Sequence, residues 1–313
     1  MFVHLHWHST FSFLEAIGKP WKIASRAKEL GMPAVAITDY NGIYGTIKFL
    51  QACKDEWIKP IIWAELGFVL DFASKNVVEN IGNIVILAQN NDGYQNLMEL
   101  ISFAGKEWIV GKPKIDVSVL SRLWSGIIAF FWWKESWIWK MILNDEKEEK
   151  IKEIINMIQN AVGKENTYLE IIAQQESLDN DLQKVNHAIL SLSKELNVPC
   201  VVNTNYHYIK KDDRAAWEIA LDIKDGKRSF DEWRRQVKGE FYIMTEEEIL
   251  DVCKKNWYDE SLIQSWIANN LAISEHIETK IKLNQILFPN YESPEDIQEL
   301  YQKYWDQLIE KND

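Results

Sequence analysis

The sequence predicts an α/β fold, a closed or nearly closed β/α barrel followed by a mostly helical region. As far as about Asp213, short apolar runs alternate with amphipathic segments. The runs are apolar throughout rather than alternating, which is typical of parallel strands buried on both faces and joined by crossover helices. Seven or so such units favour a barrel over a small open sheet.

Each apolar run of four to six residues is interpreted as a strand. The expected strands are Phe2–His6, Ala34–Thr38, Pro60–Glu65, Ile84–Ala88, Gly126–Phe131, Tyr168–Ile172 and Cys200–Asn203. Apolar residues at helical spacing lie between them. The helices expected from this spacing are Lys22–Leu30, Ile47–Lys54, Tyr94–Ala104, a stretch from Ile151 to Ile158 and a stretch from Leu182 to Leu196.

Beyond Asp213 the pattern becomes mainly helical. Thr245 and Glu248 have the spacing of a capping box, in which each side chain satisfies the other residue's backbone N–H. A long amphipathic stretch covers Leu262–Ile277, and one more polar helix follows Pro289. We therefore expect a helical C-terminal extension after the barrel.

Composition and charge exclude several classes of protein. The 313 residues include 35 Lys and Arg against 47 Asp and Glu, a net charge of −12, which disfavours nonspecific binding to DNA phosphates. The three cysteines, Cys53, Cys200 and Cys253, are far apart, which argues against a disulfide framework and a cysteine zinc site. No apolar run is long enough for a membrane span, and MFVHLHWHS does not begin a secretory signal. A cytoplasmic protein without membrane contact is expected.

Half of the six histidines lie within five residues at the N-terminus. His4, His6 and His8 alternate along the first expected strand, which places them on one face. Imidazoles at this spacing can share a metal ion such as zinc or manganese. The alternation is equally compatible with hydrogen-bonded histidines in an ordinary strand, so both interpretations stay open on the residues alone.

Several longer segments occur in an order that is specific to one family. They are HLHWHSTFSFL, ELGMPAVAITDYNGIYGTIKF, ACKDEWIKPIIWAE, NIVILAQNNDGYQNLMELI, NTNYHYI and IKDGK. This series resembles the polymerase-and-histidinol-phosphatase (PHP) domain at the N-terminus of the bacterial replicative DNA polymerase III alpha subunit, from Met1 through Phe288. The resemblance implies a distorted seven-stranded β/α barrel over residues 1–285. Residues 286–313 would then begin the next polymerase module, truncated before the palm.

The resemblance also implies a metal site that has lost ligands. Positions that keep a plausible ligand are His6, His8, Glu15, Glu65 and His207, whereas ligand positions of the family fall here on Tyr40, Asn83, Trp133 and Asn205. Tryptophan cannot coordinate a metal, and asparagine offers only a neutral carbonyl. We expect at most one weakly held zinc or manganese ion near His6, His8 and Glu65, with no catalytic residues. Asp39 is interpreted as a loop cap rather than as a residue that orients these histidines.

The function implied by the resemblance is that of a non-catalytic part of a polymerase. The intact protein would perform template-directed DNA synthesis with magnesium, and this part would be a scaffold or docking surface for a proofreading exonuclease. Contacts with DNA and with a sliding clamp would use other regions. The alternative is a free-standing metal-dependent PHP phosphoesterase. The tail LFPNYESPEDIQELYQKYWDQLIEK favours the first reading, because it resembles the segment that leads into the polymerase palm.

One feature of the composition is abnormal, because 15 Trp outnumber 13 Gly. Trp57 follows a helix in KDEWIKP, where the similar segments KELGMP and KELNVP have Gly31 and Asn197. Residues after a helix often adopt a left-handed conformation that glycine accepts freely. Tryptophans at positions where the family pattern has glycine are Trp57, Trp63, Trp132, Trp139 and Trp305, and Trp133 meets glycine in some family members.

These tryptophans have two explanations. We hypothesise that many are glycine in the living protein, because some bacterial lineages read the UGA codon as glycine while another translation table reads it as tryptophan. Trp7 and Trp217 do not align with glycines of the family and are taken as genuine. The alternative is an aromatic surface for a partner or for stacking on bases.

Overall fold

The computed structural model describes residues 1–70, 72, 81–106, 112–131, 136–283 and 295–310. The chain divides into two units, Met1–Lys280 and Ile281–Asp313. The second unit contains helix α11 (Glu295–Glu310), which exposes Leu300, Tyr304 and Trp305. The start of a following module at residue 286 stays a prediction.

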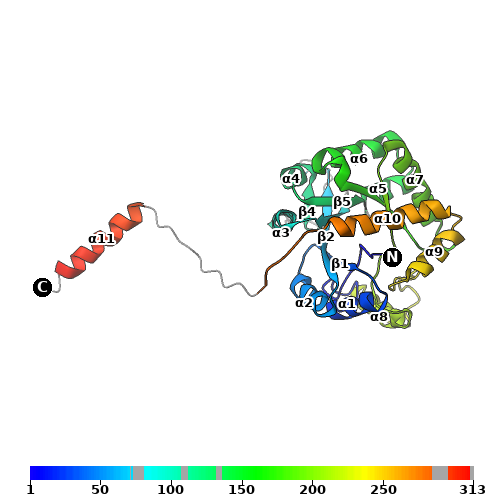
Figure 1. Ribbon diagram of the computed structural model, residues 1–313, viewed down its shortest axis with the longest axis horizontal. Helices are drawn as coiled ribbons and strands as arrows, with labels where there is room; N and C mark the ends of the chain where they lie inside the picture. Colours follow the sequence, from blue (N-terminus) through cyan, green and yellow to red (C-terminus); the bar gives the residue numbers. More distant parts are fainter. Residues whose placement is uncertain (71, 73–80, 107–111, 132–135, 284–294, 311–313) are drawn as a thin grey trace. The chain divides into compact units, whose positions relative to one another are not determined.

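The first unit is built around one seven-stranded sheet. Its strands are β1 (Ala34–Tyr40), β2 (Lys59–Val69), β3 (Gly82–Ala88), β4 (Lys114–Asp116), β5 (Ile127–Phe131), β6 (Thr167–Ile172) and β7 (Cys200–Asn203). They follow the order β1-β2-β3-β5-β6-β7, and β4 pairs with the end of β2. The sheet curls into a half-barrel with helices on its outer side (Figure 1). The predicted α/β barrel class is confirmed.

The helices agree with the predicted pattern where it was strongest. The bounds are α1 (Pro20–Glu29), α2 (Thr46–Glu56), α3 (Asn91–Lys106), α4 (Val117–Arg122), α5 (Trp137–Leu143), α6 (Glu148–Val162), α7 (Asn180–Leu196), α8 (Arg214–Lys224), α9 (Glu246–Lys255) and α10 (Glu260–His276). The capping box is present, with Thr245 N donating to Glu248 Oε2 at 2.7 Å and Glu248 N donating to Thr245 Oγ1 at 3.1 Å. The short elements β4, α4 and α5 were not predicted.

Strand direction is the first correction, because the sheet is mixed rather than parallel. β3 runs antiparallel to both β2 and β5, with Glu65 opposite Val85 and Val85 opposite Phe130. Every residue of β3 is buried. A strand buried on both faces carries no alternation and looks the same in either direction, so the sequence pattern could not reveal its orientation.

The predicted first strand, Phe2–His6, is the second correction. Residues 2–8 lie extended between β1 and the chain after β7, but they form no regular ladder. Ala36 N donates to His4 O at 3.2 Å and Thr38 N donates to Trp7 O at 2.7 Å. Three residues of the N-terminal segment thus match two of β1, and an extra residue of this kind interrupts strand pairing. On the other side His8 N donates to Tyr206 O at 3.1 Å.

Helix α10 covers the seam between this N-terminal segment and β7, near the N-terminus (Figure 1). The fully buried Asn270 donates through Nδ2 to Val3 O at 3.1 Å and to Val202 O at 2.8 Å. Its Oδ1 accepts from Val202 N at 3.0 Å. One side chain therefore joins the irregular N-terminal segment to the last strand and fixes the histidines relative to the sheet.

Candidate metal centre

Three buried side chains meet beside the carboxyl end of β1. His6 and His8 come from the N-terminal segment, and Glu65 lies in β2 opposite Tyr40 of β1. The two Nε2 atoms are 3.1 Å apart, and each lies 3.7 Å from Glu65 Oε2. We call these three residues the triad. Among the described residues it is the only group of three or more His, Cys, Asp or Glu that brings its ligand atoms this close together.

The triad has the spacing and charge state that a divalent metal requires. Zinc–ligand bonds of about 2.0–2.1 Å in a tetrahedron place ligand atoms about 3.4 Å apart, which lies between the two separations in the triad. Burial lowers the pKa of His6 and His8 well below the usual value, so both imidazoles stay neutral and can offer a lone pair. The three residues fit one ion and leave a fourth position for another ligand.

Asn83 orients the carboxylate of the triad. It lies in β3 opposite Gly67 of β2, and its Nδ2 donates a short hydrogen bond to Glu65 Oε1. This bond directs Oε2 toward the two histidines. A hydrogen bond behind a ligand fixes its orientation and tunes its affinity for the metal. The resemblance placed Asn83 at a lost ligand position. In the structure Asn83 instead orients the ligand Glu65.

His207 and Glu15 lie beside the triad without joining it. The ring of His207 stacks on His8 with centroids 4.9 Å apart, and its Nδ1 donates to Glu15 O at 2.9 Å. Burial, followed by the Arg235 charge, lowers the pKa of His207 to about 3. The Glu15 carboxylate is in an ion pair with Lys224 at the end of α8, so it is directed away from His6 and His8.

The remaining positions of the implied ligand set are filled by groups that do not bind metal strongly. The ring of Tyr40 stacks on His8 at 4.2 Å and nearly parallel, at 11°. Asn205 is buried with φ of +60°, a left-handed conformation that is uncommon outside glycine. Its Oδ1 accepts no hydrogen bond from the described residues. Trp133 lies outside the described residues.

Two other polar residues near the triad have structural roles. His4 is separate from His6 and His8, because its Nε2 bonds to Met244 O at 2.8 Å. Asp39 accepts from Ser9 N at 2.9 Å and from Ser12 Oγ at 2.7 Å, so it holds the turn that follows His8. Asp39 therefore caps a loop, although that loop is the turn over Ser9 and Ser12 and not the turn DYNG that begins at Asp39 itself.

A cavity of about 410 Å³ opens next to the triad. Glu15, Tyr40, Asn205 and His207 form its inner wall. Its outer wall comes from residues 235–238, which belong to a segment over residues 226–239 that we call the strap. This wall was not predicted from the sequence. Its signal was the cation-rich KRSFDEWRRQVK between Gly226 and Gly239, which has no helical or strand period.

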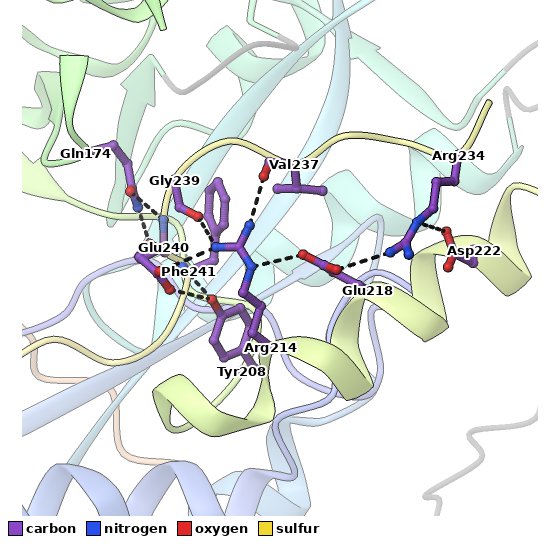
Figure 2. A network of polar contacts seen from close by, with 10 residues as sticks. All are labelled: Gln174, Tyr208, Arg214, Glu218, Asp222, Arg234, Val237, Gly239, Glu240 and Phe241. Carbon is purple, nitrogen blue, oxygen red and sulfur yellow. Dashed lines mark hydrogen bonds and ion pairs between the residues drawn. The ribbon is translucent and has the colours of Figure 1, made fainter. Parts of the chain in front are cut away.

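The strap is attached to α8 by charged side chains, as Figure 2 shows. Arg214 donates to Gly239 O at 2.6 Å and to Val237 O at 2.8 Å. Glu218 accepts from Arg214 Nε at 2.9 Å through one oxygen and from Arg234 Nη2 at 3.1 Å through the other. One carboxylate therefore joins the helix arginine that holds the end of the strap to an arginine within the strap.

No helix in the described parts of the chain combines the length and the apolar character needed to cross a membrane.

Curated relatives of the chain are DNA polymerase III alpha subunits. The chain is 30% identical over 300 residues to that of Borreliella burgdorferi, and the match covers 94% of this chain and 25% of that protein. It is 29% identical to that of Treponema pallidum with the same coverage, and 31% identical over 260 residues to that of Helicobacter pylori strain 26695, covering 79% of this chain and 21% of that protein. The chain thus spans about a quarter of the length of these relatives.

The fold also has solved neighbours. An amidohydrolase from Chromobacterium violaceum aligns with 66% of this chain and 88% of its own, with a TM-score of 0.44 and 13% identity. The family model described as "PHP domain" matches residues 4–174, which include the triad and most of the sheet. With more than half of its length matched by that model, the chain belongs to the PHP domain family.

Proposed function

We propose that the chain is the N-terminal PHP region of a replicative DNA polymerase III alpha subunit, in which the PHP domain acts as a scaffold. The observation that carries this proposal is the match to alpha subunits over 94% of the chain but only 25% of the relative. Coverage of that kind is what an N-terminal portion of a longer protein produces. The intact protein would extend DNA primers on a template.

The chemistry of DNA synthesis is assigned to regions outside this chain. Nucleotidyl transfer uses two metal ions about 4 Å apart, held by carboxylates. In the described part of the chain the triad is the one group suited to a metal, and it has a single carboxylate. Magnesium-dependent polymerase activity is therefore proposed for the intact protein and not for this portion.

The triad is proposed to hold one divalent ion, zinc or manganese, through His6, His8 and Glu65. Such an ion would polarise a bound water or a phosphoryl oxygen. The chain's own residues set the limits of that site. Asn83 orients Glu65, the Lys224 ammonium holds Glu15 away, and Tyr40 and His207 stack around His8. Because the triad supplies only three ligands, the ion would be bound weakly. Its proposed role is to stabilise the barrel.

A second function, a free-standing metal-dependent phosphoesterase, is favoured by one observation. The cavity of about 410 Å³ connects the neighbourhood of the triad with solvent, as a substrate site would require. We rank it second, because Glu15 is neutralised by Lys224 and Asn205 offers only an amide next to His207.

Metal content and hydrolysis separate the two functions. The purified chain is assayed for bound zinc and manganese, and for hydrolysis of a phosphomonoester and of single-stranded DNA, with His6→Ala as the control. The scaffold function predicts at most one ion per chain, lost in the variant, and no hydrolysis in either protein. Hydrolysis that disappears with His6→Ala would establish the phosphoesterase instead.

Sequencing the gene tests whether this chain is part of a polymerase. The reading frame should run beyond codon 313 into a region with the metal-binding aspartates of a polymerase palm. The encoded full-length protein should extend a primer with magnesium. A UAA or UAG codon directly after codon 313 would contradict this proposal and leave the phosphoesterase as the better explanation.

A further inference from the structure

The strap is held in place without a hydrophobic anchor. None of the residues 226–239 is buried, and Phe230 and Trp233 are 75% and 85% exposed. Protein segments are normally held by burial of apolar side chains, and segments without it open at low free-energy cost. The position of the strap therefore depends on its polar contacts.

Those contacts converge on three acidic residues at α8, namely Glu218, Asp222 and Asp225, and Arg235 donates to the two oxygens of Asp225 at 3.0 Å and 2.7 Å. Glu218 bridges Arg214 and Arg234, and Arg234 Nε lies 3.4 Å from Asp222 Oδ1 (Figure 2). Both arginine side chains are about a quarter to a third exposed, at 30% and 24%. Salt screens exposed charges strongly and partly buried pairs less, so a change from 0.1 M to 1 M salt, which shortens the Debye length from about 10 Å to about 3 Å, should weaken this attraction only in part.

Both ends of the strap have a backbone that suits a hinge. Gly226 has φ of +65° and Gly239 has φ of +93°, conformations that other residues rarely adopt. A glycine at each end lets the chain between them rotate with little steric resistance. Within the strap, residues 235–238 form the outer wall of the cavity beside the triad.

We propose that the strap is a gate over the metal centre, latched to α8 by the Glu218 carboxylate. In the closed state Arg214 and Arg234 bind the two oxygens of Glu218, and residues 235–238 cover His207 and the cavity. Loss of the latch lets the strap rotate about Gly226 and Gly239 and widens the opening of the cavity to solvent. The latch needs no metal, so this inference does not depend on the proposed function.

Limited trypsin digestion tests the latch, because the strap contains Lys227, Arg228, Arg234, Arg235 and Lys238. Cleavage follows the population of the open state when closing is faster than cleavage. We expect Glu218→Gln to increase the rate of cleavage in the strap about tenfold at low salt, since it weakens two charge-assisted hydrogen bonds. Raising the salt should accelerate cleavage of the wild type and have little further effect on the variant.

Two controls keep the result specific. Asp251→Asn removes another i,i+4 ion pair, that with Lys255 on α9, and should leave strap cleavage unchanged. A peptide substrate corrects for the effect of salt on trypsin. If Glu218→Gln lowers the thermal midpoint of the whole domain, Arg234→Gln is used as the test variant instead. Arg234→Gln breaks the contact with the strap but leaves the Arg214–Glu218 pair of α8 intact.

Chemical modification tests whether opening of the strap exposes His207 beside the metal centre. Diethyl pyrocarbonate acylates accessible neutral histidines, and mass spectrometry identifies the site. His207, 6% exposed on the cavity wall, should react several-fold faster in Glu218→Gln, while His187, outside the cavity with its side chain 57% exposed, should react at the same rate in both proteins. Equal strap cleavage in both proteins, or faster cleavage with unchanged reaction of His207, would overturn the gate.

Discussion

Two tryptophan side chains lie at backbone positions that favour glycine. Trp57 ends α2 with φ of +60° and is 92% exposed, and Trp257 follows α9 with φ of +64° and is 94% exposed. A side chain with a Cβ in this region clashes with its own backbone, at a cost of about 1 kcal/mol. Neither ring is buried, so packing does not offset the cost. Both positions agree with the hypothesis that glycine is the natural residue there.

Trp57→Gly and Trp257→Gly should each raise the free energy of unfolding by about 1 kcal/mol, because glycine accepts the left-handed conformation. Urea unfolding measures the change. Trp21→Gly is the matched control, since Trp21 is also exposed but lies inside α1, where glycine lowers stability by about 0.5 kcal/mol or more. A loss of stability at positions 57 and 257 would favour the aromatic surface instead.

Trp63 and Trp139 differ from these two residues. Both are buried, at 2% and 4% exposure, and Trp63 stacks on Phe130 with centroids 4.4 Å apart. Yet the indole Nε1 of Trp63 finds no hydrogen-bond partner among the described residues, which is unfavourable for a buried donor. Backbone strain thus indicates glycine as the natural residue at position 57. At position 63 only the codon in the gene can distinguish glycine from tryptophan.

Buried neutral histidines should make the metal-free protein sensitive to acid. Burial lowers the pKa of His4 and of His207 from 6.5 to about 3, so below pH 6.5 the unfolded chain binds protons that the folded chain does not. Stability is therefore full above pH 6.5 and falls as the pH drops toward 3, by about 1.4 kcal/mol per pH unit for each group. His207→Gln should reduce the slope of unfolding free energy against pH by that amount between pH 6 and 4. An unchanged slope would show that His207 is already charged in the fold.

At the scale of elements, Asn270 of α10 should contribute strongly to the free energy of unfolding, because it forms hydrogen bonds with backbone groups of both Val3 and Val202. Asn270→Ala leaves those buried groups unpaired and should cost about 3 kcal/mol. Its neighbour Asn269 makes a single such bond, to Cys200 O at 2.7 Å, and Asn269→Ala should cost about 1 kcal/mol. Denaturant unfolding compares the two. Equal losses would mean that α10 does not hold the seam through Asn270.

Elements were predictable from the sequence where local pattern alone determines them. Strands β1, β2, β5, β6 and β7 are continuous apolar runs, and helices α2, α3, α6 and α7 have strong helical periodicity and clear ends. The direction of β3 and the irregular pairing of residues 2–8 depend on partners distant in sequence, which periodicity does not report. β4 has only three residues, fewer than a periodic signal needs.

The candidate site also combines features that the sequence could reveal with features that depend on residues distant in sequence. The grouping of His6, His8 and Glu65 came from the resemblance to the PHP family, because alternation along one expected strand pairs His6 with His8 but does not point to Glu65. The ion pair of Glu15 with Lys224 could not be predicted, because the two residues are brought together only when α8 packs beside the cavity. The strap likewise depends on Arg214 and Arg234 meeting at Glu218.

For the molecule as a whole, a bound ion should link the N-terminal segment to β2. Zinc at about a hundred times its dissociation constant should raise the free energy of unfolding by about 2.7 kcal/mol. Asn83→Ala should weaken zinc binding about 10- to 100-fold, because Glu65 loses the bond that orients it. His6→Ala should abolish the stabilisation. Calorimetric titration and thermal unfolding measure both, and equal stabilisation of the wild type and His6→Ala would contradict binding at the triad.

The first residues of the chain depend on some of the last residues of the barrel unit. Val3 is hydrogen-bonded to Asn270, 267 positions later, and His4 to Met244, 240 positions later. A ribosome adds about 5–20 residues per second. Val3 and His4 therefore stay without these two distant partners for about 10–50 s after they emerge. During translation the seam beside β7 closes late, whereas His6, His8 and Glu65 of the triad are all synthesised early.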